Sequence, residues 1–179
     1  MIAHSVGKRQ QETCDRLIRK LCVRCKQPTP ENKASFYSDG NPQYKSSILK
    51  YFLEENINYG QLIKIRENGR VVRKEKKVII GDPGWIETVF VERLNLTIRN
   101  GISRLVRKTI GISKEDEMLK NQIDLYEAYY NIIRHHSGLT IKEEGKKNIM
   151  RTPLMAEEIT DHSWTWEEFL KFKPLPLVY

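Results

Sequence analysis

Apolar side chains recur every three or four residues in several stretches of the chain, which is the spacing of one face of an α-helix. This spacing predicts helices over about residues 10–26, 43–55, 85–110, 114–135 and 164–172. The longest apolar stripe lies in the third of these helices and consists of Val91, Leu94, Ile98, Ile102 and Leu105.

Residues 62–80 follow the period of β-strands instead. They surround the dipeptide Asn68-Gly69, and Asn-Gly is the strongest short signal for a β-hairpin. Further short strands are expected over residues 1–6, 34–38 and 78–80. The polar, Gly- and Lys-rich segment 138–150 predicts a loop. Helices and strands together place the chain in the α/β class.

Charge is spread unevenly along the chain, which has a formal net charge of +8. Residues 62–80 hold seven Lys or Arg and two Glu, a local charge of +5, whereas residues 151–179 hold three basic and five acidic residues. A concentrated basic region is typical of nucleic-acid-binding proteins. A solvated surface explains the charge alone equally well.

Length and composition narrow the class of protein further. A chain of 179 residues with 39% hydrophobic content is long enough for one domain with a sizeable core. No apolar run approaches the roughly 20 residues needed to span a bilayer, and nothing resembles a signal peptide. Three cysteines and 30% charged residues indicate a reduced, cytoplasmic protein without a membrane partner.

One carboxylate, Asp39, stands where a predicted strand gives way to a turn. The following residues, Gly40-Asn41-Pro42, have strong turn chemistry. Aspartate is common at such turns, but many metal-dependent enzymes also present a ligand where a strand ends. Asp39 and its neighbours leave both interpretations open.

A second carboxylate, Glu92, lies early in the longest predicted helix. At about 100° per residue, one polar seam runs beside the apolar stripe and contains Glu92, Asn95, Arg99 and Ser103. From this border Glu92 can point across a sheet edge toward Asp39, and two such carboxylates can share a hard divalent cation such as Mg²⁺. The alternative for Glu92 is an exposed glutamate paired with a neighbouring arginine.

Four segments of the chain are distinctive in their sequence and order: SDGNPQY, VFVERLNLTIRNGISRLVRKTIGISK, YYNIIRHHSGL and RTPLMAEEITDHSWTWEEFL. Together they resemble the C-terminal part of DDE transposases of bacterial and archaeal insertion sequences, over nearly the whole chain. The resemblance implies an RNase H-like mixed sheet flanked by helices, with a basic β-hairpin insertion and a helical C-terminal part.

In that family, three acidic residues bind two Mg²⁺ or Mn²⁺ ions and catalyse cleavage and transfer of DNA strands in transposition. On this chain Asp39 matches the family's second aspartate and Glu92 its glutamate, so the resemblance implies catalytic and metal-binding roles for both. Contact with DNA is expected for Asn95 and Arg99 of the seam and for a set of basic residues, namely Arg70, Arg73, Lys74, Lys77, Arg104, Arg107 and Lys108.

The chain also departs from the family's pattern. The family's first aspartate lies on a strand upstream of the residues that match Val6-Gly7-Lys8-Arg9, and the match here already begins at Ile2. Asp15 is no substitute, because it lies in the first predicted helix. We therefore expect a catalytic domain over residues 1–137 that is incomplete at its N-terminus and inactive alone, followed by a loop and short helix over 138–179. Transposases of this kind act on transposon ends and target DNA as homo-oligomers.

A protein of another class is the alternative: a non-catalytic, basic DNA-binding relic that contacts backbone phosphates through residues 64–77 and 93–108. A zinc site has less support. Cys22 and Cys25 lie on a predicted helix without a second cysteine pair downstream, so packed thiols are the favoured interpretation. Glycine-rich phosphate-binding loops are absent from the sequence.

Overall fold

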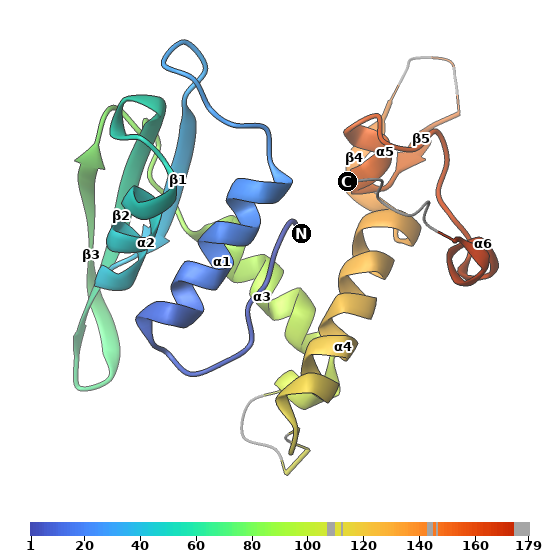
Figure 1. Cartoon of the computed structure of the whole chain (residues 1–179), viewed down its shortest axis with the longest axis horizontal. Coiled ribbons are helices and arrows are strands. Elements are labelled where there is room, and N and C mark those ends of the chain that lie inside the picture. Colours follow the sequence, from blue (N-terminus) through green and yellow to red (C-terminus); the bar gives the residue numbers. More distant parts are fainter. Residues whose placement is uncertain (107–109, 112, 143–144, 146, 174–179) are drawn as a thin grey trace. The chain divides into compact units, whose positions relative to one another are not determined.

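A mixed three-stranded sheet organises the first 120 residues (Figure 1). The computed structural model describes residues 1–106, 110–111, 113–142, 145 and 147–173. The strands lie side by side in the order β1 (Ala34–Asp39), β2 (Ile57–Glu67) and β3 (Arg70–Ile80). β1 is parallel to β2, and β3 is antiparallel to β2. The predicted α/β class is thereby confirmed.

β2 and β3 form the predicted hairpin. Asn68 and Gly69 at its tip have φ values of 48° and 79°, the left-handed backbone that a tight two-residue hairpin turn requires. The separate strand predicted over residues 78–80 was wrong, because these residues continue β3. β1 pairs with β2 only as far as Leu62, so the outer part of the hairpin is a two-stranded ribbon.

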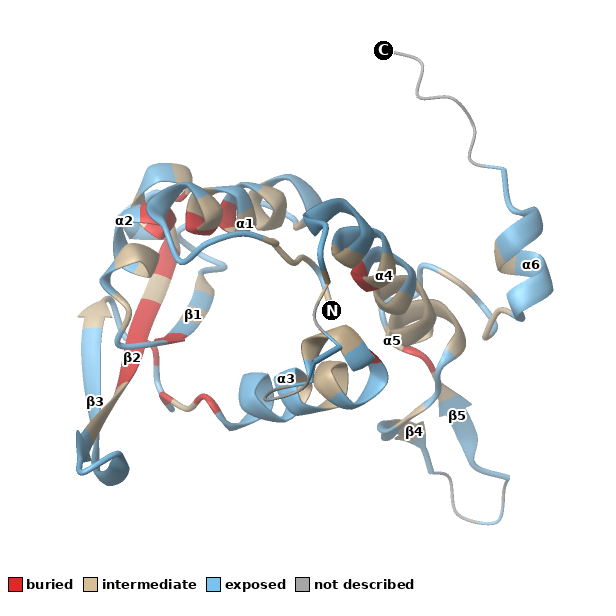
Figure 2. Ribbon diagram, turned by 90° about the horizontal axis from the view of Figure 1, so that it is seen from below, coloured by how far each residue is buried: buried red, intermediate tan, exposed pale blue. Residues whose placement is uncertain are grey.

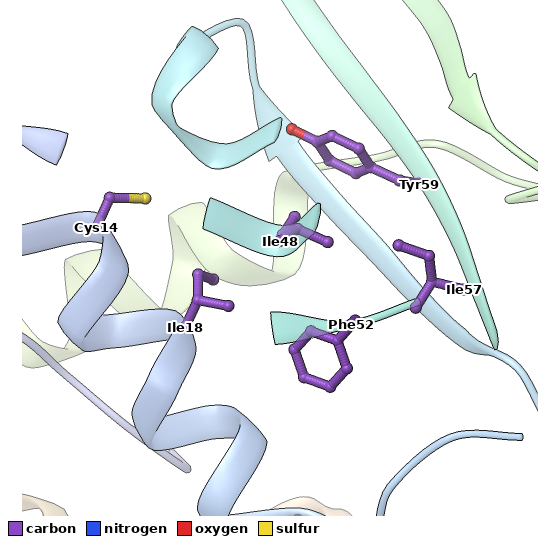
Figure 3. Packing of buried hydrophobic residues seen from close by; sticks show 6 residues of the cluster. All are labelled: Cys14, Ile18, Ile48, Phe52, Ile57 and Tyr59. Atoms are coloured by element: carbon purple, nitrogen blue, oxygen red, sulfur yellow. The ribbon is translucent and has the colours of Figure 1, made fainter. Parts of the chain in front are cut away.

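One face of this sheet carries the hydrophobic core. The crossover from β1 to β2 runs through α2 (Pro42–Tyr51) and a short 3-10 turn (Glu54–Asn56), and α1 (Gln11–Arg24) packs beside α2. Figure 3 shows the buried cluster that these elements share: Cys14, Ile18, Ile48, Phe52, Ile57 and Tyr59. Each fully buried side chain of this size contributes about 1.5–3 kcal/mol of transfer free energy.

A polar cluster ties α1 to α2 at the edge of this core. Lys50 Nζ forms an ion pair of 2.6 Å with Asp15, and Ser47 Oγ and Gln11 Nε2 donate to the same carboxylate at 2.7 and 2.9 Å. The hydrogen bonds from Lys50, Ser47 and Gln11, in that order of size, lower the pKa of Asp15 to about 2. Asp15 therefore joins two helices.

The opposite face of the sheet is covered by the segment that precedes α3 (Val89–Gly101), as Figure 2 shows. Gly60 makes this packing possible, because a Cβ at that position would lie 2.6 Å from Ile86 Cγ1. Ile86 and Thr88 are buried there, whereas α3 itself has no buried residue before Ile102 at its end. The apolar stripe predicted for this helix is thus half-exposed.

The strand predicted over residues 1–6 was wrong, since the structure assigns no strand there. This segment runs along α1 instead. Lys20 Nζ donates to the carbonyl of His4 at 2.9 Å, and Arg24 Nη1 donates to the carbonyl of Ile2 at 2.6 Å. The side chains of α1 therefore satisfy backbone acceptors that a sheet would otherwise satisfy.

The described residues after Lys120, together with Met1, form a second compact unit. α4 (Asp116–Ala128) enters this unit after Lys120 and is followed by a π-helical turn (Tyr129–Ile133). The unit also contains β4 (His136–Ile141), β5 (Ile149–Arg151), α5 (Pro153–Ala156) and α6 (Trp166–Lys171). The loop predicted over residues 138–150 was wrong in part, because β4 and β5 pair across it. The domain boundary expected after residue 137 lies inside this unit.

One further short element belongs to the described part of the chain. A 3-10 turn over Ser103–Leu105 follows α3. Among the described residues, no helix has both the length and the apolar character that crossing a membrane requires.

Candidate functional site

Asp39 is the last residue of β1 and is exposed. Its Oδ1 accepts a hydrogen bond of 3.2 Å from the backbone N–H of Asn41, and the Asn41 side chain in turn caps α2 by accepting from Gln43 N at 3.1 Å. Asp39 is thus a turn residue in its local hydrogen bonding. Asp39 also lines a cavity that is described below.

A buried chain of hydroxyl groups holds the end of β1 in place. Gln61 Nε2 donates to the Tyr59 hydroxyl at 2.7 Å, so that hydroxyl is free to donate to Ser38 Oγ, 2.7 Å away. Ser38 Oγ donates to the backbone carbonyl of Asp39 at 2.8 Å. Burial raises the pKa of Tyr59, which keeps the phenol protonated and the chain of donors intact. The backbone that carries Asp39 is therefore fixed from behind.

Glu92 lies in the first turn of α3, where a carboxylate is favoured by the helix dipole. Thr88 Oγ1 donates to Glu92 Oε1 at 2.7 Å, and Lys64 Nζ forms an ion pair with the same oxygen. The hydrogen bond from Lys64, followed by that from Thr88, lowers the pKa of Glu92. The alternative of a glutamate paired with an arginine takes a different form here, since the partner is a lysine of β2.

The strand register relates both carboxylates to one side of β2, although Asp39, at the end of β1, also lines a pocket with Cys14 and Tyr44 on the side of α1 and α2. Asp39 is in register with Leu62, and Lys64 follows Leu62 on that side of β2, because side chains alternate along a strand. Glu92 reaches this face through its ion pair with Lys64. The face is the one covered by the segment before α3, opposite the hydrophobic core (Figure 2).

Asp39 and Glu92 also line one cavity of about 1010 Å³. Asn95 and Arg99, one and two turns further along α3, line it as well. Among the described lining residues, the basic side chains are those of Arg9, Lys64, Arg66 and Arg99. Four of the five residues that the sequence singled out at the strand end and on the helix seam therefore line one cavity, and Ser103, the fifth, is not among its described lining residues. Arg9 is an addition that sequence reasoning missed, whereas Lys64 and Arg66 were expected only as members of the phosphate-contacting range 64–77 of the alternative hypothesis.

The site contains fewer acidic groups than a three-carboxylate centre. Asp39 and Glu92 are the two acidic side chains among the described residues that line the cavity. Within the described part of the chain, neither belongs to a group of three metal-ligating side chains whose ligand atoms lie within 4.8 Å of one another.

The predicted DNA-binding residues of the hairpin lie outside the cavity. Arg70, Arg73, Lys74 and Lys77 are all exposed on β3, a strand with nine exposed positions in succession. Arg73 pairs with Glu75 on its own strand. No ion pair links Arg70, Lys74 or Lys77 to a described acidic residue. These charges are therefore available to a polyanion.

The remaining predicted basic residues are placed less completely. Arg104 lies in the 3-10 turn after α3 and is half-buried. Arg107 and Lys108 lie outside the described residues. Their predicted contact with DNA has no structural description here.

The cysteines show packing rather than metal binding. Cys14 is buried in the core, and Cys22 and Cys25 are half-buried free thiols. Among the described residues, no group of three ligand side chains with ligand atoms within 4.8 Å includes a cysteine. Packed thiols, the interpretation favoured from the sequence, fit this arrangement.

Compared with known proteins, the chain matches no family model, no curated protein and no solved structure.

Proposed function

We propose that residues 2–120 form the cation- and DNA-binding part of a DDE-type transposase catalytic domain with an RNase H-like fold. The observation that carries this proposal is the shared cavity: a carboxylate at a strand end, Asp39, and a carboxylate in the first turn of a helix, Glu92, line it together. The order of strand, helix, parallel strand and later helix agrees with the mixed α/β architecture that the family resemblance implies.

The residues present are chemically suited to a hard divalent cation. Asp39 and Glu92 offer carboxylate oxygens, and such oxygens are the ligands that Mg²⁺ and Mn²⁺ take in proteins. Both carboxylates belong to residues that line the cavity, and the hydroxyl chain behind β1 fixes the backbone carbonyl of one of them, Asp39. When bound, Mg²⁺ or Mn²⁺ supplies Lewis-acid polarisation of a phosphodiester and of the oxygen that attacks it.

The chain's own residues bind and orient the nucleic acid. Lys64, Arg66 and Arg99 in the cavity are placed to bind backbone phosphates, and guanidinium groups can do so with two parallel hydrogen bonds. Asn95 offers both a donor and an acceptor on the same helix face as Glu92. The exposed charges of β3 extend this basic surface along the hairpin ribbon.

Binding of Mn²⁺ to the full chain tests the proposal directly. Electron paramagnetic resonance of free Mn²⁺ gives the affinity of the wild-type protein and of the variants Asp39→Asn and Glu92→Gln. Each substitution removes one anionic ligand and keeps the side chain's size, so we expect affinity to fall about tenfold or more in both. Asp82→Asn, an exposed carboxylate in the turn after β3, is the matched control and should bind as the wild type does.

A basic, non-catalytic DNA-binding protein is the second candidate, and the exposed charges of β3 favour it. This second candidate predicts that the protein binds DNA and that Asp39 and Glu92 hold no cation. Equal Mn²⁺ binding by the wild type, Asp39→Asn and Glu92→Gln would therefore replace the first proposal with this one.

Strand cleavage and joining by this chain alone are not expected under either candidate. Two-ion phosphoryl transfer requires ligands that bridge both ions, and the described cavity supplies two carboxylates. An assay with Mg²⁺ or Mn²⁺ on DNA should show no joined product. Cation-dependent joining that Asp39→Ala and Glu92→Ala both abolish would show that a further ligand completes the site.

A further inference from the structure

Lys64 occupies a position that the sheet itself does not favour. The register of the hairpin places it directly opposite Lys74, and like charges directly opposite each other destabilise a strand pair. The Lys64 side chain is 26% exposed, and its ammonium group forms an exposed contact with Glu92. This pairing offsets the repulsion between the two lysines.

Lys64 and a divalent cation are alternatives at Glu92. The hydrogen bond from Thr88 and the ion pair from Lys64 both end on Oε1 of that carboxylate. An ammonium group and a divalent cation at contact distance from the same carboxylate repel each other strongly. A cation at either oxygen of this carboxylate therefore weakens the pairing of Lys64 with Glu92 and favours movement of the ammonium group to another anion.

The charge of the cavity decides when this exchange is favourable. Four basic and two acidic residues are found among its described lining residues, so the surroundings of Glu92 carry excess positive charge. That excess opposes a free divalent cation. A nucleic-acid phosphate entering the cavity reverses the balance, because it attracts both the lysine and the cation.

We propose that Lys64 is a positioning residue. In the absence of nucleic acid it pairs with Glu92, and when nucleic acid enters, its ammonium group moves to pair with a backbone phosphate. This inference rests on the proposed function, since it takes Asp39 and Glu92 as cation ligands. It makes binding cooperative: nucleic acid frees Glu92 for the cation, and by linkage the cation raises affinity for nucleic acid by the same factor.

The test is Mn²⁺ binding to the full chain with and without a short DNA duplex of random sequence, after subtraction of the cation that DNA binds alone. For the wild type we expect DNA to tighten Mn²⁺ binding about tenfold, a usual size for coupling between two sites. Lys64→Gln should bind Mn²⁺ about tenfold more tightly than the wild type without DNA, and DNA should add little to its affinity.

Three further variants separate this role from a structural one. Lys76→Gln is the matched control, because Lys76 is paired with Glu87 at 3.0 Å on the same sheet face and is not among the described lining residues of the cavity. It should retain wild-type coupling. Lys64→Arg keeps the charge and should retain most of the coupling. Lys64→Met removes the charge with little change in length. It should show the same tight Mn²⁺ binding and weak coupling as Lys64→Gln, and it replaces Lys64→Gln as the test if Lys64→Gln folds poorly.

The possible failures are distinguishable. Mn²⁺ binding that depends on Asp39 and Glu92 but is the same in Lys64→Gln and the wild type, with equal coupling to DNA, overturns the role of Lys64 and leaves the proposed function standing. Mn²⁺ binding that persists unchanged in Asp39→Asn and Glu92→Gln overturns the proposed function itself.

Discussion

The two faces of the three-stranded sheet differ in almost every physical respect. The face toward α1 and α2 carries Ile57 and Tyr59, both 0% exposed, within an apolar cluster. The other face carries Asp39, Lys64 and their neighbours, which line a large cavity together with Ile18 and Ile48 of the apolar cluster, and the helix beside it has no buried residue. One sheet thus has a face for stability and a face for binding.

The polar groups of the site are placed by the backbone and by a small amount of apolar packing, that of Ile86 on Gly60. The polar face depends on backbone placement, through the register of β1 with β2 and the close approach at Gly60. Substitutions on the apolar face should therefore change the free energy of unfolding, whereas most substitutions on the polar face should change binding.

Ile57→Ala should have the largest effect on stability. Ile57 is completely buried, so the substitution removes apolar contacts and leaves a cavity, and costs about 2–5 kcal/mol of unfolding free energy. Urea denaturation of the full chain, followed by far-ultraviolet circular dichroism, measures the loss. Val72→Ala on β3 is the control, because Val72 is 52% exposed and should cost less than about 0.5 kcal/mol. Equal losses would contradict the division between the two faces.

Gly60→Ala tests whether the polar face depends on close backbone approach. The new Cβ would lie 2.6 Å from Ile86, and such overpacking costs about 1–3 kcal/mol. Because the displaced segment leads into α3, Mn²⁺ affinity should fall as well. Gly138→Ala, where the added Cβ meets no atom within 4 Å, is the control for the substitution itself. Unchanged stability and Mn²⁺ affinity in Gly60→Ala would show that this packing is dispensable.

Replacing the exposed charges of β3 should weaken DNA binding without a loss of stability. The fourfold variant with Gln at Arg70, Arg73, Lys74 and Lys77 removes up to four phosphate contacts. The slope of log affinity against log salt should then fall by up to about 3.6, as measured by fluorescence anisotropy of labelled DNA. Lys33→Gln with Lys45→Gln, both exposed elsewhere, should leave the slope nearly unchanged. A slope that does not respond to the fourfold variant would make β3 a solvated surface only.

Asp15 should give the smallest effect and the one most dependent on pH. Its pKa is about 2 in the folded chain, below the value of about 3.9 of an unfolded aspartate. A lowered pKa means that the Asp15 cluster stabilises the fold above about pH 4 and that this contribution is lost as the pH falls toward 2. The difference in melting temperature between wild type and Asp15→Asn should therefore shrink over that range. Glu12→Gln on the same helix is the control, and a constant difference would contradict the role of the cluster.

Much of the fold followed from local sequence signals. Helical spacing placed α1, α2 and α4 and the centre of α3, although α3 spans Val89–Gly101 and not the expected 85–110. Asn68-Gly69 placed the hairpin turn, because each signal acts within a few residues. β4 and β5 were missed because their segment is polar and rich in Gly and Lys, and its strands are stabilised by pairing with each other. A strand was expected at residues 1–6 because the apolar residues there resemble the end of a strand. In the structure, basic side chains of α1 donate hydrogen bonds to the backbone carbonyls of this segment instead.

The carboxylates of the candidate site were predictable from the sequence, but the basic side chains that pair with them were not. A strand end and a helix seam are visible in sequence, so Asp39, Glu92, Asn95 and Arg99 could be chosen. Lys64 was predicted only as one of several basic residues, with no role of its own. Its pairing with Glu92 depends on the register of β2 and on the position of α3, which are set by contacts far apart in the chain.

The two outer strands of the sheet also have unequal consequences for how the protein behaves at high concentration. β3 carries five basic residues and one acidic residue, so a second copy approaching its free edge meets like charge. β1 carries a single charge, Asp39 at its end, and no described strand covers its outer edge. Self-association through added strands is therefore directed to β1. A copy added at β1 would bury the backbone that leads to Asp39. Self-association at high protein concentration would therefore reduce access to the cavity.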